Sequence, residues 1–303
     1  MPSLTGAEFG YCPRRLTLRS GDVEVTTLDT FDAAIEEVSS SVFVRGGWAY
    51  SPRWQNDTGG SRRDVLPRVR VFGLPKTHIV QVRGPTDAGL LDFLVWVLSF
   101  FLGMRLTTTR AGFVDATPVD LGKLVDFVWL HDRELEKALS LAVAFWQGDS
   151  PDRRQSKLWA AATHALFLSQ QPGALQYERF SYGYTSIDAC YALARLVFPG
   201  SGAKTHADRI AWMCEATGTP VPPWAEQVSA SPLIATLRNA TIHEGLFANE
   251  PLGFGIFRSE QTPNLTLEMA NLSCRFLVAL LGALDNDYVR VPVTTYQTQG
   301  LRL

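Results

Sequence analysis

Hydrophobic and polar residues alternate in short runs through the first part of the chain, a pattern typical of β-strands. Residues 16–18 and 23–28 are two such runs, and the turn sequence at 20–22 between them predicts a β-hairpin. Three further β-rich runs lie at 41–50, 67–72 and 77–82. The polar, glycine-containing segment 54–63 predicts a loop. We therefore expect a small sheet domain in the N-terminal part of the chain.

The period of the pattern changes after these runs. Residues 87–104 present apolar side chains around nearly the whole circumference of a helix, which is typical of a buried helix. A short extended segment follows at 105–114, and Pro118 then begins a second helical pattern that extends over 119–146. We place the boundary between two domains in this region, between residues 115 and 116.

The segment 148–152 is a linker or cap signal, and the β-strand pattern disappears beyond it. Helical patterns then follow at about 153–170, 175–198, 204–215, 231–244 and 265–284. The predicted fold class is α+β. A β-rich N-terminal domain with a buried helix spans residues 1–115, and an all-α helical domain follows at residues 116–303.

The helix predicted at 231–244 is specified at both ends. Ser231 is a favourable N-cap, Pro232 fits the first turn, and Gly245 provides a left-handed stop. At about 100° per residue, the helix has two faces of different character. The apolar face carries Leu233, Ile234, Leu237, Ala240 and Thr241, and the opposite face carries Arg238, Asn239, Ile242 and His243.

Three polar side chains share this second face. The guanidinium of Arg238 is charged at every physiological pH and the imidazole of His243 titrates near neutrality, a pairing suited to moving protons around a phosphate. Asn239 lies one turn from His243 on the same face. The alternative is an ordinary solvent-facing helix. However, Ile242 in the middle of the polar face favours an interface between two copies of the helix.

Two other polar residues are candidates for supporting this site. Asp188 lies within an apolar helical pattern, where it is either a buried partner of the site or a structural hydrogen-bonding group. His206 lies near the start of the helix predicted at 204–215. There it either extends a binding cleft or belongs to a solvated helix start.

Composition narrows the classes of function. The 303-residue chain has 46% hydrophobic residues, enough for a substantial core, and its formal net charge of -2 argues against nonspecific coating of nucleic acid. The 4 cysteines are far apart and predict neither a disulfide framework nor a zinc site. The longest apolar run, 90–104, is interrupted by Asp92 and is too short to span a bilayer. We expect a cytoplasmic protein without membrane association.

The sequence lacks other common catalytic motifs. His243 and Glu244 begin the zinc-protease helix motif, but Phe247 stands where the second histidine ligand belongs. The sequence has no phosphate-binding glycine loop followed by lysine, no nucleophile elbow and no spaced acidic cluster for paired magnesium ions. We therefore expect chemistry that uses neither a metal nor a cofactor.

Five helical patterns with Arg-Asn-Ala-Thr-Ile-His on the fourth, at 238–243, resemble the HEPN superfamily of helical domains. Many HEPN domains are metal-independent ribonucleases in bacterial defence, toxin and CRISPR systems. The segment 176–190 is similar to the long helix of bacterial proteins in which a HEPN domain follows a β-rich N-terminal domain. The resemblance covers about residues 135–290.

The resemblance implies a homodimer in which the motif helices of two protomers face each other and form one cleft for RNA. The 2′-hydroxyl of the substrate would attack the adjacent phosphate, leaving a 2′,3′-cyclic phosphate and a 5′-hydroxyl. In this scheme His243 transfers protons and Arg238 holds the phosphate with its developing charge. Asn239 either orients His243 or bonds the phosphate.

Two hypotheses follow from the resemblance. The first is a dimeric HEPN endoribonuclease, an effector in antiviral defence or a toxin-like protein, whose N-terminal domain is where a protein or ligand regulates it. The second is a noncatalytic HEPN module for dimerisation and for binding a ligand or protein. They differ in whether Arg238 and His243 of both protomers face one open cleft.

Overall fold

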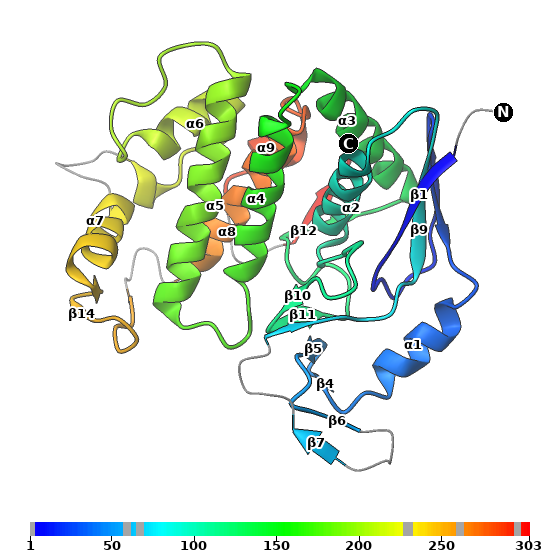
Figure 1. The fold of residues 1–303 in the computed structure, drawn as a ribbon. Helices are drawn as coiled ribbons and strands as arrows, with labels where there is room; N and C mark the ends of the chain where they lie inside the picture. The colour runs from blue at the N-terminus through cyan, green and yellow to red at the C-terminus, as the bar shows by residue number, and fades with distance from the viewer. Residues whose placement is uncertain (1–3, 57–61, 65–69, 227–232, 259–263, 294–297) are drawn as a thin grey trace. The chain divides into compact units, whose positions relative to one another are not determined.

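The computed structural model describes residues 4–56, 62–64, 70–226, 233–258, 264–293 and 298–303. Within these ranges the chain is an α+β protein, as predicted, with β-sheets followed by a helical bundle (Figure 1). The chain divides into two compact units, one of residues 1–123 and 131–143 and the other of residues 124–130 and 144–303. The boundary of an independently folding domain between residues 115 and 116 stays a prediction.

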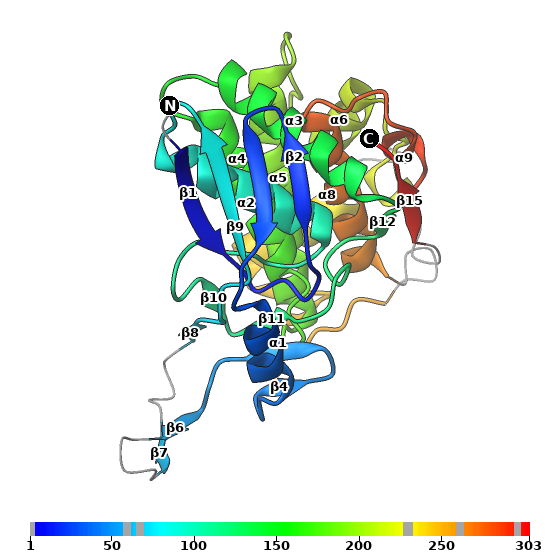
Figure 2. The same cartoon turned by 90° about the vertical axis from the view of Figure 1, so that its right-hand side faces the viewer.

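The first unit contains a four-stranded antiparallel sheet (Figure 2). Its strand order is β1 (Leu4–Phe9), β9 (His78–Arg83), β3 (Val23–Thr27) and β2 (Thr17–Ser20). The predicted hairpin is confirmed, because β2 pairs with β3 and Gly21 turns between them in the left-handed conformation that favours glycine. Leu18, Val25 and Val80 are cross-strand neighbours and are fully buried. This row of side chains therefore belongs to the core.

Helix α2 (Ala88–Leu102) is the buried helix predicted for the first part of the chain. The carboxylate of Asp87 caps it by accepting the N–H of Leu90 at 2.9 Å, and Gly103 ends it with φ 61°. Apolar side chains cover nearly its whole circumference, and the helix packs against β9 and β1. It therefore fills the core beneath the sheet.

Helix α1 (Phe31–Ser39) lies outside the predicted elements, and it buries Phe31, Ala34 and Val38 at helical spacing. Further short strands are β4 (Val44–Arg45), β5 (Trp48–Tyr50), β6 (Trp54–Asn56), β7 (Arg62–Asp64), β8 (Val71–Phe72), β10 (Phe113–Val114) and β11 (Ala116–Pro118). The prediction of a loop at 54–63 is wrong at its ends, because β6 and β7 pair there as antiparallel strands.

The helix predicted at 119–146 begins later than expected. After Pro118 the chain turns and forms strand β12 (Phe127–Trp129), and helix α3 (Asp132–Gly148) starts only after it. Asp132 and Glu134 lie in the first turn of α3, where negative charge is favourable near the positive end of the helix dipole. These charged residues therefore mark the start of the helix.

The second unit is a helical bundle in which α4 (Arg154–Leu168), α5 (Gln176–Val197) and α8 (Leu265–Leu280) pack together (Figure 1). The indole N–H of the buried Trp159 on α4 donates to the carbonyl of Leu277 on α8 at 3.0 Å. The hydroxyl of Ser186 on α5 donates to the carbonyl of Ala162 on α4 at 2.9 Å. These bonds join three helices whose apolar faces form one core.

Several smaller elements also belong to this unit, among them the 3₁₀ turn Pro223–Ala225. The others are α6 (Arg209–Thr217), α7 (Leu233–Asn239), α9 (Asp287–Arg290), β13 (Leu246–Phe247), β14 (Glu250–Pro251) and β15 (Gln299–Leu301), which pairs in parallel with β12. Helix α6 starts later than the predicted 204, because Asp208 accepts hydrogen bonds from the N–H and hydroxyl of Thr205 and holds a turn there. None of the helices within the described ranges has both the length and the apolar character needed to cross a bilayer.

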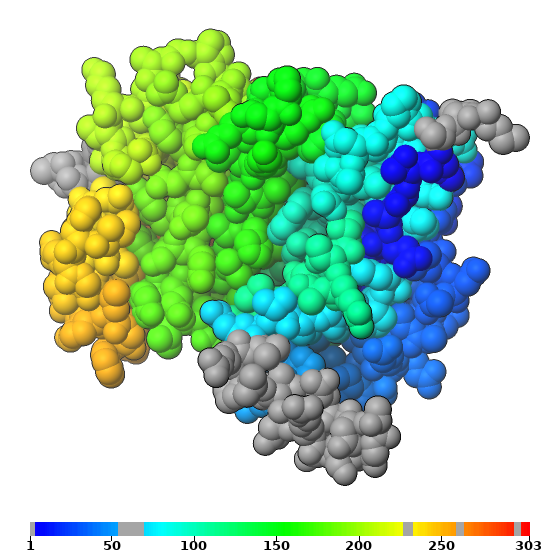
Figure 3. Space-filling model, in the orientation of Figure 1, coloured from blue at the N-terminus to red at the C-terminus, as the bar shows by residue number. Residues whose placement is uncertain are grey.

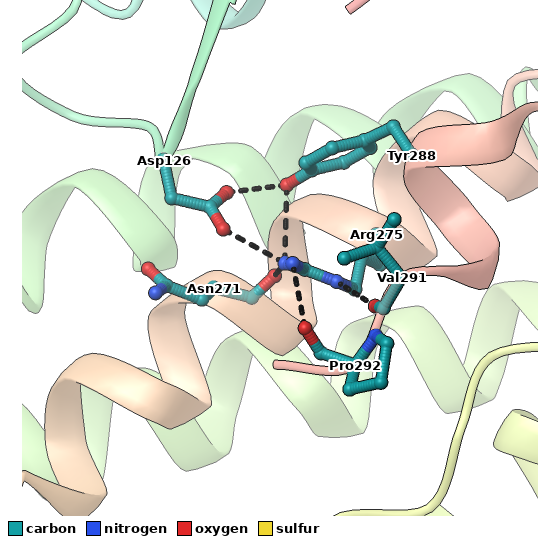
Figure 4. Close-up of polar contacts among 6 residues, drawn as sticks. All are labelled: Asp126, Asn271, Arg275, Tyr288, Val291 and Pro292. Carbon is teal, nitrogen blue, oxygen red and sulfur yellow. Dashed lines mark hydrogen bonds and ion pairs between the residues drawn. The ribbon is translucent and has the colours of Figure 1, made fainter. Parts of the chain in front are cut away.

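A buried ion pair, which the sequence patterns do not predict, lies inside this unit (Figure 4). Arg275 of α8 is fully buried, and its Nη1 lies 2.8 Å from Oδ2 of Asp126. The hydroxyl of Tyr288 on α9 donates to the other oxygen of the same carboxylate. Arg275 also donates to the carbonyls of Asn271 and Val291, each at 2.8 Å. The guanidinium therefore connects the segment before β12, helix α8 and the chain after α9.

Candidate functional site

The three candidate catalytic residues lie on α7 and on the turn that follows it. The turn, Ala240–Glu244, is π-helical. The prediction of one continuous α-helix over 231–244 is therefore wrong beyond Asn239. Ser231 and Pro232, the predicted start of the helix, lie outside the described residues.

The π-helical turn has a defined end. The hydroxyl of Thr241 within the turn donates to the carbonyl of Leu237 at 2.7 Å. The N–H of Gly245 then donates to the carbonyl of Ala240, five residues earlier. Gly245 has φ 68°, so the predicted left-handed stop is confirmed.

This turn determines which side chains meet. In a continuous α-helix, residues five apart are separated by about 140° around the axis, because each residue turns about 100°. A π-helical turn is wider than an α-helical turn, so residues five apart lie closer together around its axis. Nη1 of Arg238 accordingly lies 3.2 Å from Nε2 of His243, and it donates to Oδ1 of Asn239 at 3.0 Å. The structure therefore brings the three candidate residues together.

The contact assigns the donor and acceptor roles of the two side chains. The guanidinium of Arg238 has only N–H donors, so Nε2 of His243 accepts and the proton of the neutral ring is on Nδ1. Asn239 and His243 are exposed, whereas Arg238 is half-buried. Nε of Arg238 is buried, and within the described residues it has no hydrogen-bond partner. The cluster thus presents a fixed cation, an amide and a proton acceptor at the surface.

Both supporting residues lie in the electrostatic neighbourhood of Arg238. Oδ1 of Asp188 on α5 accepts from Nη1 of Arg209 on α6 at 2.7 Å. Desolvation lowers the pKa of His206, and the positive charges of Arg209 and Arg238 lower it further. Desolvation raises the pKa of Tyr184, the charge of Asp188 raises it further, and Arg238 and Arg209 oppose this shift. Residues from α5, the start of α6 and α7 therefore share one charged region.

Sequence reasoning misses Tyr184 as a member of this region. Tyr184 lies one helical turn before Asp188, so the two share a face of α5. In the sequence, Arg209 lies with His206 near the start of a helix, where it either extends a binding cleft or belongs to a solvated helix start. Its contact with Asp188 depends on the relative position of α5 and α6, which no local pattern records.

The turn and the chain that follows it expose several apolar side chains. Ile242 is 58% exposed, Phe254 82% and Ile256 61%. The side-chain amide of Gln176, at the start of α5, bonds both the N–H and the carbonyl of Phe257, at 2.6 and 3.0 Å. This pair of bonds fixes the end of the exposed segment, which forms part of the surface in the space-filling view (Figure 3).

Among the described residues, no group of three or more histidine, cysteine, aspartate or glutamate side chains has an arrangement that could hold a metal ion. The polar groups gathered at Arg238 are an amide, a guanidinium and a single imidazole. Comparison of the chain with protein-family models, with curated proteins and with solved structures found no match.

Proposed function

We propose that the chain is a metal-independent endoribonuclease of the HEPN type that acts as a homodimer through its motif helix. The observation that carries the proposal is the 3.2 Å contact between Nη1 of Arg238 and Nε2 of His243 at the surface end of α7. A guanidinium that binds phosphate oxygens next to an imidazole that accepts a proton is the minimum set for cleavage by the 2′-hydroxyl.

The proposed reaction uses only groups of the chain and of the RNA. Nη1 of Arg238 turns from Nε2 of His243 to the phosphate, and the freed Nε2 takes the proton of the 2′-hydroxyl. The oxygen attacks phosphorus, the bond to the 5′-oxygen breaks, and the protonated imidazole gives its proton to that oxygen. Arg238 stabilises the charge that develops on the phosphate, and proton transfer of this kind contributes about 10²–10⁴-fold to the rate. Oδ1 of Asn239 accepts from Arg238, which supports a role in holding the guanidinium.

A noncatalytic HEPN module is the second candidate. The exposed side chains of Ile242, Phe254 and Ile256 favour it, because a surface that is covered by a partner chain explains apolar residues at these positions. A dimer with residues 231–247 at its interface fits both candidates. In the catalytic case, the two copies of Arg238 and His243 face one open cleft.

The wider proposal concerns regulation and biological context. We propose an effector in antiviral defence or a toxin-like protein, in which the β-rich unit receives a protein or ligand regulator. A separate compact unit of residues 1–123 and 131–143, with its own sheet and core, supports a function distinct from that of the helical part.

The test is incubation of the purified protein with total cellular RNA in EDTA, followed by analysis of the fragment ends. We expect 2′,3′-cyclic phosphate and 5′-hydroxyl ends from the wild type and intact RNA with His243→Ala. Cleavage that stops in EDTA, or that proceeds at the wild-type rate in His243→Ala, contradicts the proposed chemistry. A stable dimer that binds but never cleaves RNA favours the noncatalytic module.

A further inference from the structure

Two arginines from different helices of the second unit lie near the same residues of α5. Arg209, at the start of α6, bonds Asp188, and its guanidinium also lies over the ring of Tyr191 with 4.7 Å to the centroid. Arg238 lies at the end of α7, and its charge acts on Tyr184, one turn from Asp188. In Figure 1, α6 and α7 both lie to the left of α5.

Both guanidiniums keep hydrogen-bond donors for a ligand. Within the described chain, the hydrogen bond of Arg209 uses Nη1 alone, and those of Arg238 likewise use Nη1 alone. Arg209 therefore retains Nε and Nη2, the two nitrogens that together match two phosphate oxygens. Arg238 retains Nη2, since its Nε is buried. Asp188 neutralises one of the two positive charges, so the group formed by Arg209, Arg238 and Asp188 keeps a net charge of about +1.

We propose that Arg209 binds a second backbone phosphate of the RNA strand, next to the phosphate held by Arg238, and that Asp188 positions its guanidinium. The inference rests on the proposed function, since it concerns the same substrate. A strand that crosses from α7 to α6 places one phosphate on each of the two cations. The ring of Tyr191 packs against the guanidinium of Arg209, which restricts the orientations that the guanidinium can adopt.

The test measures binding of a single-stranded RNA that is 2′-O-methylated throughout, so it cannot be cleaved through its 2′-hydroxyls. Fluorescence anisotropy of the full chain at several salt concentrations gives the affinity and its salt dependence. The variants are Arg209→Gln, Arg209→Lys, Asp188→Asn and Arg238→Gln. Arg290→Gln is the matched control, because Arg290 also pairs with a single aspartate in this unit, Asp285 at 2.6 Å.

We expect Arg209→Gln to weaken binding about 10- to 100-fold, as for loss of a charged hydrogen bond. The slope of log affinity against log salt becomes shallower by about 0.7, the value for one phosphate contact on a single strand. Arg209→Lys keeps the slope and loses part of the affinity, because the charge stays and the planar fork is lost. Asp188→Asn also loses part of the affinity although it removes a negative charge, because the guanidinium of Arg209 is no longer held in position. Arg290→Gln leaves both quantities unchanged.

The outcomes separate this inference from the proposed function. Weak binding by Arg238→Gln together with wild-type affinity and slope in Arg209→Gln overturns the second phosphate contact and leaves the proposed function intact. A loss of affinity in Arg209→Gln without a change of slope also overturns the contact, since it indicates a structural effect. If Arg209→Gln does not fold, wild-type affinity in Arg209→Lys overturns it. A wild type that neither binds nor cleaves RNA rejects the proposed function as well.

Discussion

Oδ2 of Asp126 lies 2.8 Å from Nη1 of Arg275, although 149 residues separate the two in the chain. Neither side chain is in contact with bulk solvent to any large extent, since Arg275 is 0% and Asp126 8% exposed. The guanidinium is further bonded to backbone carbonyls, so its donors are satisfied without water (Figure 4). The pair therefore fixes the segment 124–130 to the helical bundle.

Asp126→Ala should destabilise the protein by about 3–5 kcal/mol, because it leaves a buried guanidinium without its counter-charge. Urea denaturation followed by circular dichroism gives the change in the free energy of unfolding. Asp285→Ala is the matched control, since it breaks the ion pair with Arg290 at a carboxylate that is 96% exposed. The control should leave the midpoint nearly unchanged. Equal midpoints for the two variants would show that the buried pair is not important for stability.

The stability of the first unit should depend on pH through His78. Desolvation lowers the pKa of His78 to about 4 from an ordinary value of 6.5, and the ring is fully buried against Phe9 and Phe31. The unfolded chain therefore binds the proton more readily between these two values. Stability is highest above pH 6.5 and falls as the pH is lowered toward 4, by on the order of 3 kcal/mol.

Thermal melting between about pH 4 and 7 of the wild type and of His78→Phe measures this contribution. Phenylalanine keeps an aromatic ring packed against Phe9 and Phe31 and cannot be protonated. The loss of stability below the ordinary pKa of histidine should therefore become smaller. His131→Gln, at an exposed histidine, should follow the wild-type curve. If the melting temperatures of the wild type and His78→Phe fall in parallel as the pH is lowered, His78 is not the source of the pH dependence.

His243→Ala should reduce the rate of RNA cleavage about 100-fold or more, the usual contribution of a general acid–base group. The exposed position of His243 means that stability should change by less than about 0.5 kcal/mol. Arg238→Lys should be nearly as damaging, because lysine keeps the charge but lacks the planar guanidinium that bonds Asn239 and His243 while it presents Nη2 to the phosphate. Glu244→Ala, an exposed neighbour on the same turn, is the control and should retain full activity. The measurement is single-turnover cleavage of a labelled oligonucleotide.

The protein should sediment as a symmetric dimer at micromolar concentration. Ile242→Asp and Phe254→Asp should shift it to a monomer without lowering the melting temperature, because both side chains are largely exposed within one chain. Leu196→Asp, at another exposed apolar residue of the same unit, should leave the dimer intact. A wild-type monomer, or a dimer that neither substitution disrupts, would contradict a site shared by the motif helices of two protomers.

A truncated chain of residues 116–303 should fold and should show altered activity. It keeps Asp126 and β12, which bond Arg275 and pair with β15. A shorter chain of residues 132–303 lacks both and should melt at a lower temperature. Circular dichroism compares the two truncated chains, and a disordered or insoluble product for residues 116–303 would refute the predicted division at residue 115.

Local patterns predict much of the fold where one segment contains the whole signal. The hairpin around Gly21 and helix α2 are examples, because turn residues and apolar periodicity lie within the elements themselves. Strand β1 escapes prediction since its burial comes from pairing with β9, far along the chain. Helix α1 escapes it because only three of its residues, Phe31, Ala34 and Val38, carry the helical spacing.

The candidate site is predictable in composition but not in geometry. The helical wheel places Arg238, Asn239 and His243 on the side away from the core, spread over about 140°. The π-helical turn that accompanies the contact between Arg238 and His243 has no signal in the local pattern. The partner of Arg275 is not predictable for a different reason. A single arginine in an apolar helix indicates a buried partner, but the pattern does not say where in the chain that partner lies.

The π-helical turn also bears on how related sequences should be compared. Deleting one residue from Ala240–Glu244 would restore an α-helical register, in which residues four apart share a face. An arginine and a histidine four apart on an ordinary α-helix, and five apart across a π-helical turn, would therefore present the same pair of groups. A search for distant relatives that fixes this spacing at one value will overlook chains that differ only by the inserted residue.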